Sequence, residues 1–218
     1  MKLTDHMQAA SVTENAMNGG IEERQTSGST ALLGPGRLVL VVGPSGAGKD
    51  TLMNALRDSL DGDPAYIFAR RLITRTTDGA TEDHDAIGRA EFDGLYREGR
   101  VALAWEAHGL GYILPESIDD GIRAGHTVIA NGSRQILNQA RQKYASLTIL
   151  LVTAPIDVLA GRLAARGRES REEISRRLSR ADIDMPDVPG VIRIDNSGKL
   201  DDSLACMRKA IGLPATAG

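Results

Sequence analysis

Short apolar runs and helical patterns alternate along most of the chain. The stretches 37–42, 126–131 and 147–153, whose inner residues are mostly apolar, are typical of strands that are buried on both faces. Apolar residues recur at helical spacing between these runs, for example in residues 52–60. The alternation predicts an α/β fold with a parallel β-sheet core, flanked by helices on both faces and joined by right-handed crossovers. In such sheets, ligands bind at the carboxyl ends of the strands.

Other stretches complete the predicted element order. Residues 65–74 are predicted as one strand, 90–99 as a short helix that ends at Gly99, and 101–107 as a further strand. Tyr112–Leu114 is compatible with another short strand. Later helices are predicted at 115–125, 133–144, 155–167, 170–185 and 199–212, with a last strand at 190–196.

The first 34 residues lack this periodicity. They are polar and rich in Gly, Ser, Thr and Glu, so they cannot bury enough apolar surface to offset the entropy lost on ordering. We therefore predict a disordered or weakly ordered N-terminal tail at 1–34, followed by one domain at 35–218.

Composition narrows the classes of function. The chain has 218 residues, of which 41% are hydrophobic and 25% charged, as is typical of a globular domain. The net charge of −3 provides no basic field for nucleic acid, and no apolar stretch reaches the ~18 residues of a membrane span. The single Cys206 excludes an intramolecular disulfide and suits a reducing compartment. We therefore expect a cytoplasmic protein that binds neither nucleic acid nor membranes.

The stretch "GPSGAGKDT", residues 43–51, directly follows the first buried strand. It matches the phosphate-binding loop G-x-x-x-x-G-K-[ST] at Gly43, Gly48 and Lys49 but has Asp50 at the last position, with Thr51 one place late. Glycine lets backbone N–H groups approach phosphate, the helix N-terminus adds partial positive charge, and the lysine adds a full charge. The predicted ATP-binding residues here are Gly43, Pro44, Ser45, Gly46, Ala47, Gly48, Lys49, Asp50 and Thr51.

Asp50 stands where a hydroxyl that holds Mg²⁺ is expected. A carboxylate at about 4 Å from a phosphate charge is repelled by about 1–4 kcal/mol unless a cation lies between them. In many P-loop enzymes a neighbouring strand ends in an acid that helps to hold the metal, whereas here the strand ends in Asn131. We therefore predict that Asp50 binds Mg²⁺ directly or through water. The alternative is a first-turn acid that only interacts favourably with the helix dipole.

Arginines are concentrated in residues 161–180. Some fit a solvated helix face with glutamate partners at i,i+4, namely Arg162, Arg171, Arg176 and Arg180. Arg166 and Arg168 differ, because they flank Gly167 at a predicted helix break. An arginine-bearing segment that closes over ATP can neutralise the transferred phosphoryl group, so we predict a lid at about 164–178. The cations predicted to act in catalysis are Lys49, Arg166, Arg168 and Arg177.

The order of these motifs resembles that of the guanylate-kinase-like family of P-loop kinases. The resemblance rests on "GPSGAGK", "ITR", "WEAHG", "RGRESREEISRRL" and "DNSG", and covers roughly residues 36–212. It implies a P-loop core, an acceptor-binding insertion at about 70–115 and the lid. Within this family, "GKD" together with "EDH" and "NGSR" resembles the ribose 1,5-bisphosphate phosphokinases. These use ATP to make 5-phosphoribosyl 1-diphosphate in phosphonate catabolism.

The resemblance also implies acceptor-binding residues. In guanylate kinases the insertion holds the nucleotide phosphate with two arginines and a tyrosine. Here Arg75 matches the first arginine, Asp78 replaces the second, and His84 stands where the tyrosine is expected. Glu106 matches a glutamate that helps to read guanine, and Tyr112 loosely matches a later tyrosine. A sugar bisphosphate has no base to be read, so a partial loss of the nucleotide pattern fits it. The implied acceptor-binding residues are Arg75, His84, Glu106, His108 and Tyr112.

The accepting atom in that reaction is an oxygen of a phosphate, which is already ionised at neutral pH. The predicted mechanism therefore needs no general base and depends on positioning and on charge neutralisation by Mg²⁺ and the cations. Asn196, after the last strand, is placed either to contact the adenine of ATP or only to form a turn. Two other functions stay open: a guanylate or other nucleoside monophosphate kinase, and a catalytically inactive interaction module. The sequence leaves the oligomeric state open.

Overall fold

The structure is a computed structural model of the chain. It describes residues 31–75, 84–107, 109–165, 174, 178 and 189–214. The compact unit that contains the described helices and strands is Leu32–Gly218. Several predictions concern residues outside the described ones: the N-terminal tail up to residue 30, the predicted helix start at Ser170, and the candidate site residues His108, Arg166, Arg168 and Arg177.

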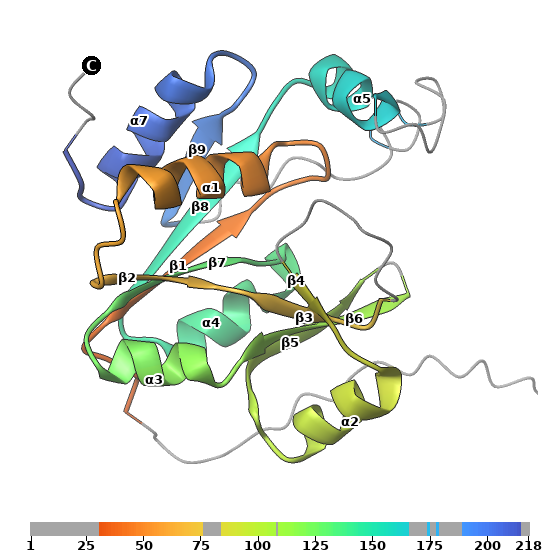
Figure 1. The fold of residues 1–218 in the computed structure, drawn as a ribbon, viewed down its shortest axis with the longest axis vertical. Coiled ribbons are helices and arrows are strands. Elements are labelled where there is room, and N and C mark those ends of the chain that lie inside the picture. The colour runs from red at the N-terminus through yellow and green to blue at the C-terminus, as the bar shows by residue number, and fades with distance from the viewer. Residues whose placement is uncertain are drawn as a thin grey trace, which may run out of the picture. The chain divides into compact units, whose positions relative to one another are not determined.

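A five-stranded parallel sheet forms the centre of this unit, as predicted (Figure 1). Its order is β2 (Tyr66–Ala69), β7 (Thr127–Asn131), β1 (Arg37–Val42), β8 (Leu147–Thr153) and β9 (Val191–Asp195). Every neighbouring pair is parallel. The register places Val41 opposite Asn131 and Thr153 opposite Asp195. The carboxyl ends of these parallel strands therefore lie at the same end of the sheet.

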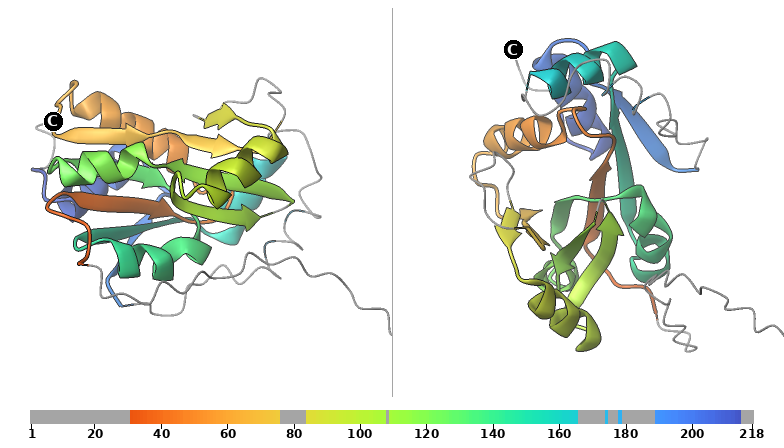
Figure 2. Two further views of the ribbon diagram at one scale, coloured as in Figure 1. Left: turned by 90° about the horizontal axis from the view of Figure 1, so that it is seen from below. Right: turned by 90° about the vertical axis from the view of Figure 1, so that its right-hand side faces the viewer.

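The side chains of β1 alternate between two apolar cores, which explains why this strand reads as a continuous apolar run. Val39 and Val41 pack in a cluster with the helices α1 (Lys49–Ser59), α5 (Ile156–Ala164) and α7 (Leu200–Ala210). Leu38, Leu40 and Val42 pack in a second cluster with α3 (Ser117–Arg123) and α4 (Leu137–Lys143). The two groups of helices lie on opposite faces of the sheet, and the left view of Figure 2 looks onto the face with α3 and α4.

A second sheet of four strands was not predicted as such. Its order is β4 (His84–Ala86), β3 (Arg71–Ile73), β6 (Leu110–Pro115) and β5 (Val101–Ala107), and α2 (Arg89–Arg97) packs against it. β3 pairs parallel with β4 and antiparallel with β6. Buried residues of β5 and β6, among them Trp105 and Leu114, join the cluster on the α3–α4 face of the central sheet.

The prediction of one strand at 65–74 is wrong. The chain leaves the central sheet after β2 and enters the second sheet at β3, and Arg70 separates the two strands. The Arg70 side chain is exposed and pairs with Asp85 at 2.8 Å. Alternation of apolar residues reports that a segment is extended but not which sheet it joins, because strand pairing is set by distant residues.

The helix start predicted at Ser133 is confirmed in its local geometry. The Ser133 hydroxyl accepts a hydrogen bond of 3.3 Å from the backbone N–H of Gln135, at the start of a 3₁₀ turn (Arg134–Ile136) that leads into α4. Within the described ranges, no helix combines the length and the apolar character needed to cross a bilayer.

Candidate active site

The loop between β1 and α1 requires glycine at three positions. Gly43, Gly46 and Gly48 have φ values of 147°, 84° and 84°, which side-chain-bearing residues rarely adopt. A Cβ atom at Gly43 would collide with the carbonyl oxygen of Val152, and one at Gly48 with the side-chain amide of Asn196. The loop backbone is therefore packed closely against the ends of β8 and β9, as a rigid cradle requires.

Lys49 is the first residue of α1 and lies inside this cradle. Its ammonium Nζ donates hydrogen bonds to the carbonyl oxygens of Gly43, at 2.9 Å, and Pro44, at 3.1 Å. These contacts hold the positive charge over the loop, beside the N-terminal turn of a helix. The arrangement is suited to a polyphosphate, whose charge both groups attract.

Asp50 contacts the residue that ends the neighbouring strand. Asn131, at the end of β7, is only 4% exposed, and its Nδ2 donates a 2.7 Å hydrogen bond to Asp50 Oδ1. Asn131 Oδ1 is buried and has no hydrogen-bond partner within the described ranges. A carboxylate and an amide oxygen, both hard donors, thus meet beside the loop. Such a donor set fits Mg²⁺.

Asn196 supports the loop from the end of β9. It is 5% exposed, and its Nδ2 donates a 2.8 Å hydrogen bond to the carbonyl oxygen of Ala47. Its backbone N–H donates to Thr153 O at 2.8 Å, which continues the pairing of β8 and β9. The side-chain amide of Asn196 is thus bonded to the loop backbone. Of the two roles that the sequence left open, an adenine contact or a plain turn, the adenine contact stays a prediction.

The assignment of Arg162 to a solvated helix face is wrong. Arg162, in α5, is half-buried, and its Nη2 donates a 2.8 Å hydrogen bond to Asn196 O. Its Nη1 is buried and has no hydrogen-bond partner in the part of the chain that the structure describes. Helical spacing alone could not reveal this contact, because the bonded carbonyl is 34 residues away in the chain.

Three of the predicted acceptor residues lie at one end of the second sheet. Thr74 Oγ1 accepts a 2.7 Å hydrogen bond from the N–H of Gly111, and Gly111 pairs with Glu106. Arg75 follows Thr74 directly, and Tyr112 follows Gly111. The strand pairing therefore brings the backbones of Arg75, Glu106 and Tyr112 together.

Two of these side chains already have partners, one on α2 and one on β5. Glu106 Oε1 forms an ion pair with Arg89 Nη1 at 2.6 Å, and the interaction with this carboxylate is the main cause that raises the pKa of Arg89 above its ordinary value. The ring of Tyr112 stacks on that of Trp105, with centroids 5.1 Å apart and planes 4° from parallel. Trp105 is buried in the core, so Tyr112 lies over an apolar support.

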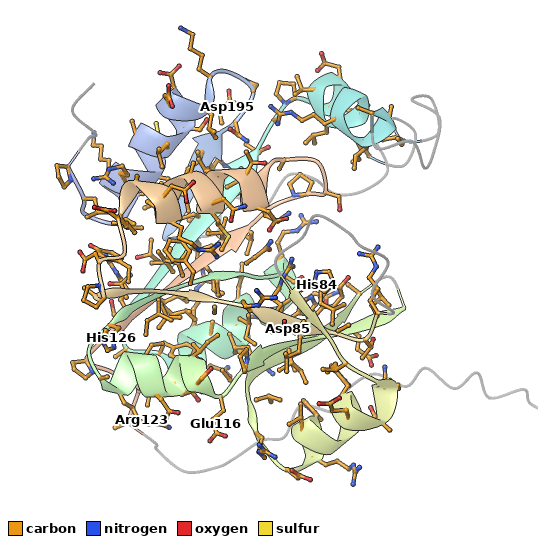
Figure 3. The ribbon with its side chains drawn as sticks, in the orientation of Figure 1. His84, Asp85, Glu116, Arg123, His126 and Asp195 are labelled. Carbon is orange, nitrogen blue, oxygen red and sulfur yellow. The ribbon has the colours of Figure 1, made fainter. Side chains whose placement is uncertain are left out.

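His84 lies apart from these three residues, on β4 opposite Arg71. Its ring is half-buried, and its Nδ1 is buried with no hydrogen-bond partner among the residues that the structure describes. Figure 3 shows His84 beside Asp85 on β4, whereas His126 lies near Arg123 and α3. His126 directly precedes β7. It therefore lies at the amino-terminal end of the parallel strands, whereas the loop lies at their carboxyl end.

A small pocket lies where α1 meets β2, β3 and β7, and sequence reasoning missed most of it. Its lining residues are Asp50, Met53, Asn54, Arg57, Ala69, Arg71 and Asn131. Arg71 is 8% exposed although it is charged. An arginine at the start of a short strand gives no sign of burial in the sequence, because the burial comes from pairing with distant strands.

Of the predicted lid, the structure describes Ala164 and Ala165, at the end of α5, and farther along Ile174 and Leu178. Ile174 and Leu178 are buried, at 1% and 5% exposure, in the same apolar cluster as Leu163 of α5. The predicted lid segment thus has apolar anchors on the face of the sheet that also carries α1. The roles of its arginines stay predictions.

Comparison with known proteins gives a consistent result. The chain is 52% identical over 169 residues to a ribose 1,5-bisphosphate phosphokinase from Brucella melitensis, which covers 77% of this chain and 88% of that protein. It is 52% identical over 160 residues to one from Rhodopseudomonas palustris, covering 73% of this chain and 82% of that protein. No protein-family model matches the chain.

Among solved structures, a guanylate kinase from Anaplasma phagocytophilum superposes with a TM-score of 0.55 at 18% identity, over 83% of this chain and 85% of that one. This likeness supports the fold and agrees with the predicted guanylate-kinase-like architecture of a parallel sheet behind a P-loop. The two sequence relatives identify the branch within that fold. The chain therefore belongs to the family of the ribose 1,5-bisphosphate phosphokinases.

Proposed function

We propose that this protein transfers the γ-phosphoryl group of ATP to the 1-phosphate of ribose 1,5-bisphosphate, with 5-phosphoribosyl 1-diphosphate and ADP as products, as a step of phosphonate catabolism. The observation that carries the proposal is the 52% identity to a phosphokinase of this name over 88% of its length. The glycine-constrained loop with Lys49 over it supports the donor half of the reaction.

The chemistry requires one bond to form and one to break. An oxygen of the 1-phosphate attacks the γ-phosphorus of ATP, and the bond from that phosphorus to the β–γ bridging oxygen breaks, so that ADP leaves. The attacking oxygen is ionised at neutral pH, so no proton must be removed. The protein therefore contributes alignment and positive charge. The ammonium of Lys49 and the N-terminal turn of α1 would supply this charge at the phosphates.

Mg²⁺ is the metal that this donor set favours. Asp50 would hold it directly or through water, and the unpartnered Oδ1 of Asn131 would serve as a second oxygen or would orient a bound water. When bound, Mg²⁺ would neutralise charge on the phosphates of ATP. No three His, Cys, Asp or Glu side chains gather within the described ranges.

The remaining roles follow the predicted regions. From the lid, Arg166, Arg168 and Arg177 would stabilise the negative charge of the transferred phosphoryl group. Asn196 would contribute to ATP binding by holding the loop in place. The predicted acceptor residues are Arg75, His84, Glu106, His108 and Tyr112. In this scheme Glu106 would exchange its ion pair with Arg89 for hydroxyl groups of the sugar.

An acceptor panel tests the proposal. The protein is incubated with ATP and Mg²⁺ and with ribose 1,5-bisphosphate, GMP, AMP or dTMP, and products are identified by ³¹P NMR. We expect a diphosphate at C1 with the sugar and little transfer to the nucleotides. Lys49→Ala, measured in parallel, should remove most of the activity, which excludes a contaminating kinase. Transfer to GMP alone would support a guanylate kinase instead, and no transfer to any acceptor would support a catalytically inactive module.

A further inference from the structure

We propose that Lys143, Asp119 and Tyr144 position the second sheet for the sugar acceptor, by holding the point where β5 is bulged. The inference rests on the proposed function and adds three positioning residues to it, none of which was predicted as a site residue. The second sheet carries the predicted acceptor residues Glu106 and Tyr112, whereas the central sheet carries the phosphate-binding loop. The relative placement of the two sheets therefore decides where the sugar lies against ATP.

The pairing of β5 with β6 is irregular near the start of β5. The register shifts between Val101 and Leu103, so that Ala102 is an extra residue on β5. An extra residue of this kind bends the strand and is left out of the ladder of backbone hydrogen bonds. Its carbonyl group then needs a donor from elsewhere. Lys143 supplies one, because its Nζ donates a 2.7 Å hydrogen bond to the carbonyl oxygen of Ala102.

Buried groups on α3 and directly after α4 fix the position of this ammonium. Asp119 Oδ2, on α3, pairs with Lys143 Nζ at 2.7 Å, and the Asp119 side chain is only 7% exposed. Tyr144 donates its hydroxyl to Asp119 Oδ1, also at 2.7 Å. Burial raises the pKa of Tyr144 above its ordinary value, so the hydroxyl stays protonated and remains a donor. Three linked interactions thus tie α3 and the end of α4 to one carbonyl of β5.

These contacts lie where the chain leaves the second sheet. β6 ends at Pro115 and α3 begins at Ser117, so Asp119 belongs to the connection back to the central sheet, and α3 also contacts β5 (Figure 1). Apolar packing joins the two sheets as well, through Trp105 among others, but such packing is not directional. The hydrogen bond to the bulge is directional, so it fixes the tilt of β5 more closely than the packing does.

A small change of tilt at the bulge would reach the acceptor residues. Glu106 is the fourth residue after Ala102 on β5, which places it about 13 Å further along the strand. A rotation of about 5° at the bulge would move Glu106 by about 1 Å over that length. A displacement of about 1 Å is enough to slow a transfer reaction by about 100-fold. Lys143 thus acts on the reaction through β5, without contact with the sugar or ATP.

Separate titrations of the two substrates test this inference without turnover. Calorimetry measures the Kd of ribose 1,5-bisphosphate without ATP, and the Kd of ATP with Mg²⁺ without the sugar. Lys143→Met keeps the aliphatic part of the side chain and removes the ammonium. We expect it to weaken sugar binding by about 10-fold, as for a charged hydrogen bond that is no longer well formed, and to leave ATP binding as in the wild type. A merely structural role would lower the active fraction for both ligands and leave both Kd values unchanged.

The same helix provides a matched control. Arg141 also donates to a backbone carbonyl, that of Pro189 at 2.9 Å, but this carbonyl precedes β9 of the central sheet. Arg141→Met should therefore leave sugar binding unchanged, and an equal loss in this variant would contradict the inference. Lys143→Arg keeps the charge and the donors, so it should retain most of the sugar affinity. Unchanged sugar binding in Lys143→Met, or equal weakening of sugar and ATP, would show that the inference is wrong.

Further outcomes separate the inference from the proposed function. Should Lys143→Met fail to fold, Tyr144→Phe decides, because it removes only the hydroxyl that holds Asp119. It should weaken sugar binding by about 2- to 10-fold at unchanged ATP binding, and normal sugar binding would overturn the inference. If the wild type phosphorylates the sugar and Lys143→Met binds it normally, the proposed function stands and the inference fails. If the wild type phosphorylates only GMP, the proposed function is wrong, and the same titrations with GMP decide the inference.

Discussion

Asn131 and Asp50 are 81 residues apart in the chain and are joined by a 2.7 Å hydrogen bond from Nδ2 to Oδ1. An amide at the end of β7 donates to the loop carboxylate, whereas an acid at this position would repel it. The contact thus accounts for two departures from the usual P-loop pattern together: the acid missing from the strand and the acid present in the loop. In this arrangement the carboxylate is supplied by Asp50 of α1, and Asn131 at the end of β7 supplies the amide that holds it.

Asp50→Asn tests whether this carboxylate serves the metal. The variant keeps the shape of the side chain and removes its charge. We expect a higher Mg²⁺ concentration for half-maximal rate, because a hard anionic donor is lost. Binding of ATP without metal should be unchanged or tighter, since a repulsive charge is gone. Steady-state rates over a Mg²⁺ titration, with metal-free ATP binding as the control, make the comparison. An unaltered titration would mean that Asp50 is only a favourable acid at a helix start.

The exchange of the two groups gives a sharper prediction. Asn131→Asp alone should lower kcat/KM, because two carboxylates would then meet where a hydrogen bond of 2.7 Å stands now. Asp50→Ser alone should also be poorly active, since no nearby acid remains. The double variant Asp50→Ser with Asn131→Asp should be more active than either single change. A double-mutant cycle on kcat/KM measures this coupling, and strictly additive effects would contradict it.

Local patterns in the sequence were sufficient for the buried strands β1, β7 and β8 and for the loop. The apolar runs that form β1, β7 and β8 each pack on both faces of the sheet. The glycines of the loop indicate a backbone conformation that other residues rarely adopt. Both features are fixed by residues that are close in the chain. The family resemblance added the second region but not its strand order.

Contacts between distant segments explain what the sequence did not reveal. Arg162 has the spacing of a solvent-exposed helical arginine, yet its side chain donates a hydrogen bond to the backbone carbonyl of Asn196, which follows β9. Arg71 resembles an exposed strand residue, yet pairing of β3 with β4 and β6 buries it. The partner of Glu106 is Arg89, on a helix whose packing is equally invisible in a linear pattern. In each case the charge was evident and its surroundings were not.

The lid arginines lead to a kinetic prediction. Arg168→Ala should lower kcat more than it weakens ATP binding, because a cation that closes over the transferred group acts most strongly in the transition state. Arg166→Ala should behave in this way instead if the segment is turned the other way. Arg97→Ala, which removes an exposed arginine from α2, is a surface control. If kcat is normal in both lid variants, these arginines are surface charges and the lid assignment is wrong.

The variant Asn196→Ala distinguishes two roles of this residue in ATP binding: a contact with the adenine and support of the loop. If its amide reads adenine, Asn196→Ala should change the preference between ATP and GTP as phosphoryl donors. If it supports the loop through Ala47 O, the variant should raise KM for both donors by a similar factor, because both bind the loop through the same phosphates. The structure favours the second outcome, since the amide is buried and bonded at 2.8 Å.

Loss of one buried hydrogen bond costs about 1–3 kcal/mol, so the loop should also become less rigid and the protein less stable. Measured donor ratios, together with thermal unfolding, decide between the two roles, and a shifted ATP-to-GTP ratio at unchanged stability would contradict the loop-supporting role.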